Sequence, residues 1–220
     1  MLIHKTLGSD RGFTLVELLV ASMVTMVVLG GAVALTSQVQ EGYRRQIESS
    51  AAEQEGRYAL DWVSRLIRAS GNNPYNVAIT DCPSAATPFA AIVFDPDGDD
   101  IDNDIRLQTD SNPPDGLLGG VAGGCSQANE DVTVSFDPDT NSITFLDNNL
   151  GGTATIRTDA VIDDLRFIYR DAARAVTTNP LNVVYVETQV TVRSRTINAV
   201  TGEPVTRVLS QEVRIRGRNY

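Results

Sequence analysis

Histidine and lysine are almost absent from this chain of 220 residues, because each occurs only once, as His4 and Lys5. Beyond these first positions the chain has no imidazole to serve as a general base, to complete a catalytic triad or to ligate a metal ion. The sequence also contains no P-loop, no G-x-G-x-x-G and no H-E-x-x-H pattern. We therefore expect a protein that is not an enzyme.

Positive charge is scarce relative to negative charge. The chain has 28 acidic and 18 basic side chains, which gives a formal net charge of -10. Binding to the phosphate backbone of a nucleic acid requires clustered positive charge. The charge balance therefore predicts no nucleic-acid partner.

Cysteine is also rare, and the two that occur are Cys82 and Cys125. If this part of the chain is exported to an oxidising compartment, we expect the two to form a disulfide. The bond would close a loop of about 44 residues and contribute roughly 4 kcal/mol in the chain-entropy model. Free buried thiols and a metal site are the alternatives, although two thiolates without histidine make a poor zinc site.

One long segment lacks charge altogether. Residues 18–40 contain no acidic or basic side chain and are long enough to span a bilayer as a helix. Lys5 and Arg11 precede this segment, which predicts an N-terminus on the cytoplasmic side and export of the rest of the chain. Apolar residues then continue at helical spacing, at Val39, Tyr43, Ile47, Ala51, Trp62, Val63, Leu66 and Ile67.

The composition after Pro74 changes to turn-forming residues and short β-prone runs. The sequence therefore predicts an α+β fold, with a long N-terminal α-helix whose transmembrane first half is followed by a second half packed on a C-terminal antiparallel β-sheet domain. We place the boundaries at residues 1–12, 13–40, 41–73 and 74–220. The predicted strands are residues 89–95, 104–109, 131–137, 142–147, 153–158, 164–170, 182–195 and 204–217, with a turn at "DPDTN".

The start of the apolar segment reads "GFTLVELLV". A short basic leader that ends in Gly12, followed by Phe13 and by the acid Glu17 four residues later, resembles type IV prepilins and the related pseudopilins. The resemblance implies a pilin-like fold, with residues 1–12 as the leader peptide. It also implies that a prepilin peptidase cuts between Gly12 and Phe13 and that the new amine of Phe13 is methylated.

Glu17 is an acid within an apolar helix, where a charge without a partner costs free energy. In a bundle of parallel helices from several subunits, the ammonium group of Phe13 can approach Glu17 of a neighbouring subunit. In a medium of low dielectric constant this pair is strongly preferred over two separate charges. We therefore expect Glu17 to direct assembly with other minor and major pilins through packing of the N-terminal helices.

The C-terminal part carries a second resemblance. The runs "NEDVTVSFDPDTNSITFLDN", "VIDDLRFIYRD" and "VRIRGRNY" resemble minor pilins of the PilW type and the related PulJ-type pseudopilins. This resemblance implies a structural subunit that helps to initiate or cap a type IV pilus. It would reside in the bacterial inner membrane with its C-terminal domain in the periplasm, and then in a pilus or pseudopilus at the cell surface.

Three alternatives stay open at this point. The first is a pseudopilin of a type II secretion system, which has the same sequence features. The second is a secreted domain that begins at Leu35, because Ala32-Val33-Ala34 fits the cleavage pattern of an ordinary signal peptidase. The third is a membrane-anchored ligand-binding or adhesion domain that does not polymerise.

An acidic run, "DPDGDDIDND", occupies residues 95–104. Carboxylate oxygens at this density suit Ca²⁺, although the position of the glycine and Arg106 in place of a glutamate rule out an EF-hand. A solvated acidic turn between two strands and a calcium loop of another type are both consistent with the run. Apart from this calcium we expect no cofactor, and the candidate ligands are Asp95, Asp97, Asp99, Asp102 and Asp104.

Overall fold

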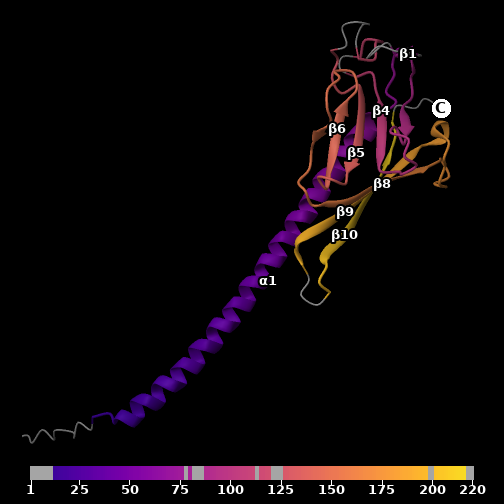
Figure 1. Ribbon diagram of the computed structural model, residues 1–220. Helices are drawn as coiled ribbons and strands as arrows, with labels where there is room; N and C mark the ends of the chain where they lie inside the picture. Colours follow the sequence, from indigo (N-terminus) through magenta and orange to yellow (C-terminus); the bar gives the residue numbers. More distant parts are fainter. Residues whose placement is uncertain are drawn as a thin grey trace, which may run out of the picture. The chain divides into compact units, whose positions relative to one another are not determined.

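The computed structural model describes residues 12–76, 79–80, 87–111, 114–119, 126–197 and 201–216. In these residues one α-helix precedes a series of antiparallel strands (Figure 1). The chain divides into two compact units, Met1–Gln46 and Ile47–Tyr220. The elements are α1 (Leu15–Ala69), β1 (Ile79–Thr80), β2 (Thr87–Pro88), β3 (Ile92–Phe94), β4 (Asp104–Gln108), β5 (Asp131–Asp137), β6 (Ser142–Asp147), β7 (Thr155–Ile156), β8 (Ile162–Arg170), the 3₁₀ turn η1 (Pro180–Asn182), β9 (Tyr185–Ile197) and β10 (Pro204–Arg214).

The described part of the first unit is residues 12–46, which form the N-terminal portion of α1 and the three residues before it. Its side chains are exposed throughout residues 12–44, and most of them are apolar. An exposed apolar surface of this extent is not typical of a soluble monomer and points to a lipid or protein environment. Val39 and Tyr43, the first members of the predicted apolar stripe, are exposed.

The second unit begins within α1, and here one face of the helix is buried. The buried positions recur every three or four residues, as expected for a helix with one covered face. Trp62 lies edge-on to Phe145 of β6, with ring centroids 5.9 Å apart, so this face contacts the sheet. The buried helical residues are Ala52, Gly56, Ala59, Leu60, Val63, Ser64 and Ile67.

Gly56 marks the closest approach of α1 to the strands. A Cβ atom at this position would lie 2.7 Å from Leu209 Cδ1 and 2.7 Å from Val192 Cγ1. Such distances are far below ordinary van der Waals contact, so a side chain could enter only if its neighbours moved. The glycine thus allows the helix backbone to pack directly over β9 and β10.

The end of α1 is anchored to the sheet. Gly71 adopts a positive φ of 75°, which L side chains rarely adopt and which is common just after a helix. Its N–H donates to the carbonyl of Gln108 at 2.8 Å, and the N–H of Asp110 donates to the carbonyl of Asn72 at 2.7 Å. The chain therefore joins β4 directly after the helix ends.

A five-stranded antiparallel sheet has the order β3-β4-β5-β6-β7. Strands β5 and β6 have the predicted bounds and form a hairpin in which Asp137 pairs with Ser142. In its turn, Asp137 Oδ1 accepts a hydrogen bond from the N–H of Asp139 at 2.9 Å, and Asn141 takes a φ of 52°. These are the roles for which Asp and Asn are favoured in turns.

A three-stranded antiparallel sheet has the order β10-β9-β8. Alternate residues of β9 are buried, including Val186, Val190 and Val192, and polar residues lie between them, as in a strand with one covered face. The strand begins at Tyr185 rather than at residue 182, because Asn179 caps the preceding 3₁₀ turn by accepting from the N–H of Leu181 at 3.0 Å.

The predicted α+β fold is confirmed, since the long N-terminal helix packs on antiparallel sheets. Some bounds differ from the prediction. Strand β3 is shorter because the N–H of Ala90 donates to the side chain of Gln108 at 2.8 Å instead of joining the ladder. The short strands β1 and β2, which pair with each other, were not predicted. Cys82 and Cys125 lie outside the described residues, and the four predicted segment boundaries stay predictions.

Candidate functional site

The first candidate site is the start of α1, where the predicted cleavage position meets the helix. Thr14 precedes the first helical residue, Leu15, and Glu17 is the third residue of the helix. The N–H of Thr14 donates to Glu17 Oε2 at 2.9 Å, and the N–H of Glu17 donates to Thr14 Oγ1 at 3.2 Å. The hydroxyl of Thr14 also donates to Glu17 Oε2 at 3.0 Å. This reciprocal arrangement is a capping box.

The T-x-x-E spacing of Thr14 and Glu17 is a signal for a capping box that the sequence analysis does not use. The sequence predicts a partner for Glu17 on another subunit, and the structure adds a partner in the same chain, Thr14. Both hydrogen bonds from Thr14 use Oε2 of Glu17, and Oε1 accepts no hydrogen bond from the described residues. Gly12 and Phe13 lie just before the helix and are exposed.

The helix that follows suits a lipid environment. Among the described residues, α1 is the one helix long and apolar enough to cross a membrane. Its few hydroxyl groups donate to backbone carbonyls of the same helix, as Thr25 does to Ala21 at 2.7 Å and Thr36 does to Ala32 at 2.8 Å. Such bonds satisfy polar side chains where no water is present.

The second candidate site is the turn between β3 and β4. In this hairpin Phe94 pairs with Ile105, so Asp95 and Asp104 occupy the next positions on the two arms. One carboxylate oxygen from each of Asp95, Asp97 and Asp104 lies within 4.8 Å of the others. The predicted ligands Asp99 and Asp102 do not belong to this group of three, which we call the aspartate cluster.

Asp104 is the buried member of the aspartate cluster, with an exposed fraction of 1%. Its Oδ2 accepts a hydrogen bond from the N–H of Asp97 at 3.3 Å, whereas its Oδ1 is buried and has no hydrogen-bond partner in the described structure. Burial, followed by the charge of Asp97, raises the pKa of Asp104 to about 7. No arginine among the described residues forms an ion pair with the cluster.

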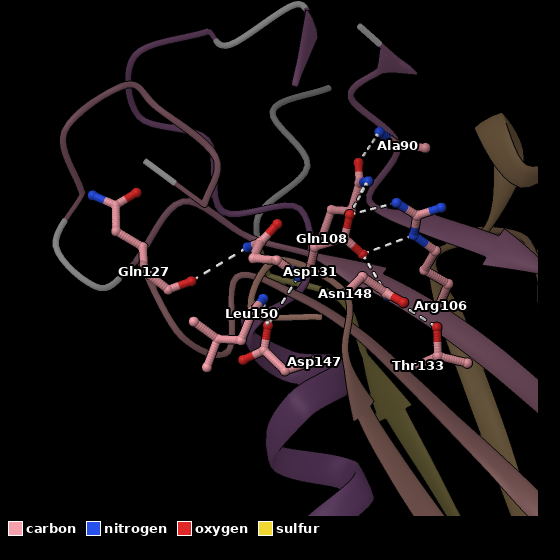
Figure 2. A network of polar contacts seen from close by, with 10 residues as sticks. Ala90, Arg106, Gln108, Gln127, Asp131, Thr133, Asp147, Asn148 and Leu150 are labelled. Carbon is pink, nitrogen blue, oxygen red and sulfur yellow. Dashed lines mark hydrogen bonds and ion pairs between the residues drawn. The ribbon is translucent and has the colours of Figure 1, made fainter. Parts of the chain in front are cut away.

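The nearest cation along the chain, Arg106, is engaged elsewhere. Figure 2 shows its guanidinium turned toward Asp131, a fully buried carboxylate on β5. Arg106 Nε and Nη2 donate to the two oxygens of Asp131 at 2.7 and 2.5 Å. Gln108 Nε2 donates to Asp131 at 2.8 Å and Asn148 Nδ2 donates at 2.9 Å, so the network joins β4 and β5 to the residues that follow β6. Arg106 therefore leaves the charge of the aspartate cluster uncompensated.

The comparisons with known proteins concern the first site. Residues 8–33 match the family described as the prokaryotic N-terminal methylation motif. No curated protein and no solved structure matches the chain significantly. The matched segment contains Gly12, Phe13, the Thr14–Glu17 capping box and the first part of the exposed apolar helix.

The match supports a subunit of the type IV pilin and pseudopilin class. It accords with a structural role rather than catalysis. In that class the motif implies processing by prepilin peptidase and association with other pilins in a membrane-anchored assembly. The apolar helix and the motif together are consistent with membrane anchoring.

Proposed function

We infer that this protein is a minor-pilin-type structural subunit that helps to initiate or cap assembly of a type IV pilus. A pseudopilin of a type II secretion system is the alternative, because both assemblies use the same N-terminal motif. The minor-pilin assignment draws on the resemblance of residues 129–148 and 161–171 to PilW-type proteins. The observation that carries the proposal is a methylation motif at the start of a helix whose apolar side chains are exposed over residues 15–44.

In this proposal the leader is removed between Gly12 and Phe13, and the new amine of Phe13 is methylated. The uncharged segment of α1 then holds the subunit in the inner membrane, with the β-rich unit in the periplasm. Cleavage would leave the capping box in place, because its backbone donor is the N–H of Thr14, which remains an amide after the cut. The helix start is therefore already capped when the subunit leaves the membrane.

Glu17 would have two roles that involve different oxygens. Oε2 accepts the hydrogen bonds of the capping box, and Oε1 is free to accept the Phe13 ammonium group of a neighbouring subunit. Removal of one partner of a desolvated ion pair costs about 3–5 kcal/mol, because the other charge is left unpaired. Loss of an N-cap costs only about 1 kcal/mol.

The two roles can be separated by substitution. Glu17→Gln keeps an amide oxygen that can accept from Thr14 but removes the charge. Thr14→Ala removes the capping hydroxyl but keeps the charge of Glu17. If charge pairing drives assembly, Glu17→Gln should lower incorporation into filaments or minor-pilin complexes by about a hundredfold or more, and Glu17→Ala should do the same.

Thr14→Ala is the matched control and should retain most incorporation. The measurement is the amount of each variant in sheared filaments or in complexes purified from membranes, relative to the processed subunit in the membrane. Normal incorporation of Glu17→Gln together with failure of Thr14→Ala would show that Glu17 acts as a helix cap, which contradicts the pairing proposal.

A further inference from the structure

The aspartate cluster of Asp95, Asp97 and Asp104 places three carboxylates around one small space at the end of the β3–β4 hairpin. One oxygen of each lies within 4.8 Å of the other two. Carboxylates this close repel one another, and none of the ion pairs among the described residues includes a member of the cluster.

A second observation points to a missing ligand. Asp104 is 1% exposed, and its Oδ1 is a buried oxygen without a hydrogen-bond partner in the described chain. An unsatisfied buried acceptor is unfavourable, and folded proteins rarely retain one unless water or an ion is bound to it.

Tyr169, beside the same turn, also has a buried oxygen without a hydrogen-bond partner among the described residues. Tyr169 stacks on Phe94, the residue before Asp95, with ring centroids 3.7 Å apart. Burial, followed by the charges of Asp102 and Asp104, raises the pKa of Tyr169 above its usual range. Asp104 Oδ1 lies at this turn, and the Tyr169 hydroxyl belongs to a ring that stacks on the residue before it, so the turn accounts for two buried polar atoms without partners.

We propose that Asp95, Asp97 and Asp104 bind one Ca²⁺ ion, with Asp104 as the buried ligand. Ca²⁺ takes oxygen ligands at about 2.3–2.6 Å in flexible geometry, so ligands on opposite sides of the ion can lie about 5 Å apart. The separations within the cluster, all of 4.8 Å or less, are compatible with one ion of this size. Mg²⁺ binds at about 2.0–2.1 Å, demands near-octahedral geometry and dehydrates reluctantly, so Ca²⁺ is the better match.

The bound ion has a structural role in this proposal. Asp95 and Asp104 lie on opposite arms of the hairpin, so an ion that both of them ligate ties β3 to β4. The same turn is joined to β8, because the N–H of Phe167 donates to the carbonyl of Asp102 at 2.8 Å. Calcium would therefore stabilise the hairpin against β8. The site does not depend on the proposed role in pilus assembly.

The test uses the full chain in detergent, depleted of metal with a chelator and then titrated with CaCl₂ or MgCl₂. Calorimetry measures the Kd, and the melting temperature is followed by the fluorescence of the single tryptophan, Trp62, which lies against Phe145. Calcium should raise the melting temperature of the unmodified chain and bind more tightly than magnesium.

Asp104→Asn and Asp97→Asn should weaken calcium binding by about tenfold or more, because each removes a charged ligand. The matched control is Asp102→Asn, which makes the same change of charge in the same loop but outside the cluster. Asp97 is exposed, so its substitution tests the site without disturbing the core. The proposal is overturned if calcium produces neither heat nor a shift in melting temperature, or if all three variants respond like the unmodified chain.

Discussion

Asp131 provides the most demanding test of how the β-rich unit is held together. This carboxylate is fully buried, yet three side chains donate hydrogen bonds to it, and one of them is the guanidinium of Arg106. Asp131→Ala would remove the acceptor for all of these donors at once. Arg106, whose side chain is 27% exposed, would then be a partly buried cation without its counter-ion.

The expected loss follows from the burial of the pair. Breaking a buried ion pair by removal of one partner costs about 3–5 kcal/mol. Domains have a total stability of about 5–15 kcal/mol, so the loss is a large part of the whole. An exposed pair should behave differently, since such pairs contribute about 0.2–1 kcal/mol. Arg65 and Asp61 on α1 form one, with side chains that are 73% and 56% exposed.

The assay is urea unfolding of the full chain in detergent, followed by Trp62 fluorescence. Asp131→Ala should lower the free energy of unfolding by about 3–5 kcal/mol. Asp61→Ala, the matched control, removes an aspartate that pairs with an arginine on the surface and should change it by less than about 1 kcal/mol. Equal effects of the two substitutions would refute the reasoning, because burial would then not determine the contribution of the pair.

Two further predictions concern packing and pH. Gly56→Leu should destabilise the second unit (Ile47–Tyr220) by about 1–3 kcal/mol, because Leu209 and Val192 already occupy the space that a side chain at residue 56 would need. Gly42→Leu should not be destabilising, because a Cβ atom at residue 42 would have no neighbour within 4 Å. The free energies of unfolding of the two variants test this prediction, and equal values would contradict it. The hydrogen bond from Arg170, followed by that from Gln189, lowers the pKa of Glu187 below its ordinary value of 4.5. The stability that results is present above about pH 4.5 and is lost as the pH falls through the lower pKa of the folded state. Glu187→Gln should therefore flatten the acid side of the curve of stability against pH, and an unchanged curve would exclude this contribution.

Much of the fold could be predicted from local patterns in the sequence. The β-prone run at residues 182–195 identified most of β9, and the "DPDTN" turn placed β5 and β6 at their observed bounds. The helix pattern identified α1 but not the face that packs. Val39 and Tyr43 have the same spacing as Val63 and Ile67, yet only the latter two are buried. Periodicity defines an apolar stripe without specifying which partner covers it.

The candidate sites were predicted less completely, because they depend on contacts between distant residues. Asp131 receives hydrogen bonds from residues 23 and 25 positions away, so its network depends on strand register. Strand register also brings Asp95 and Asp104 together, because they follow the paired residues Phe94 and Ile105 on the two arms of the hairpin. Asp99 and Asp102 lie in the turn between the arms and are not part of the aspartate cluster. The Thr14–Glu17 capping box is a local feature and could have been recognised from its T-x-x-E spacing.

The central claim is that the chain is processed and assembled as a pilin-class subunit. Its most direct test is intact-mass and N-terminal peptide analysis of the protein recovered from the membranes of its own host. A chain that begins at N-methylated Phe13 is the predicted result, and Gly12→Val should retain the leader in the same experiment. A chain that begins at Leu35, or an uncut chain that begins at Met1, would contradict the claim.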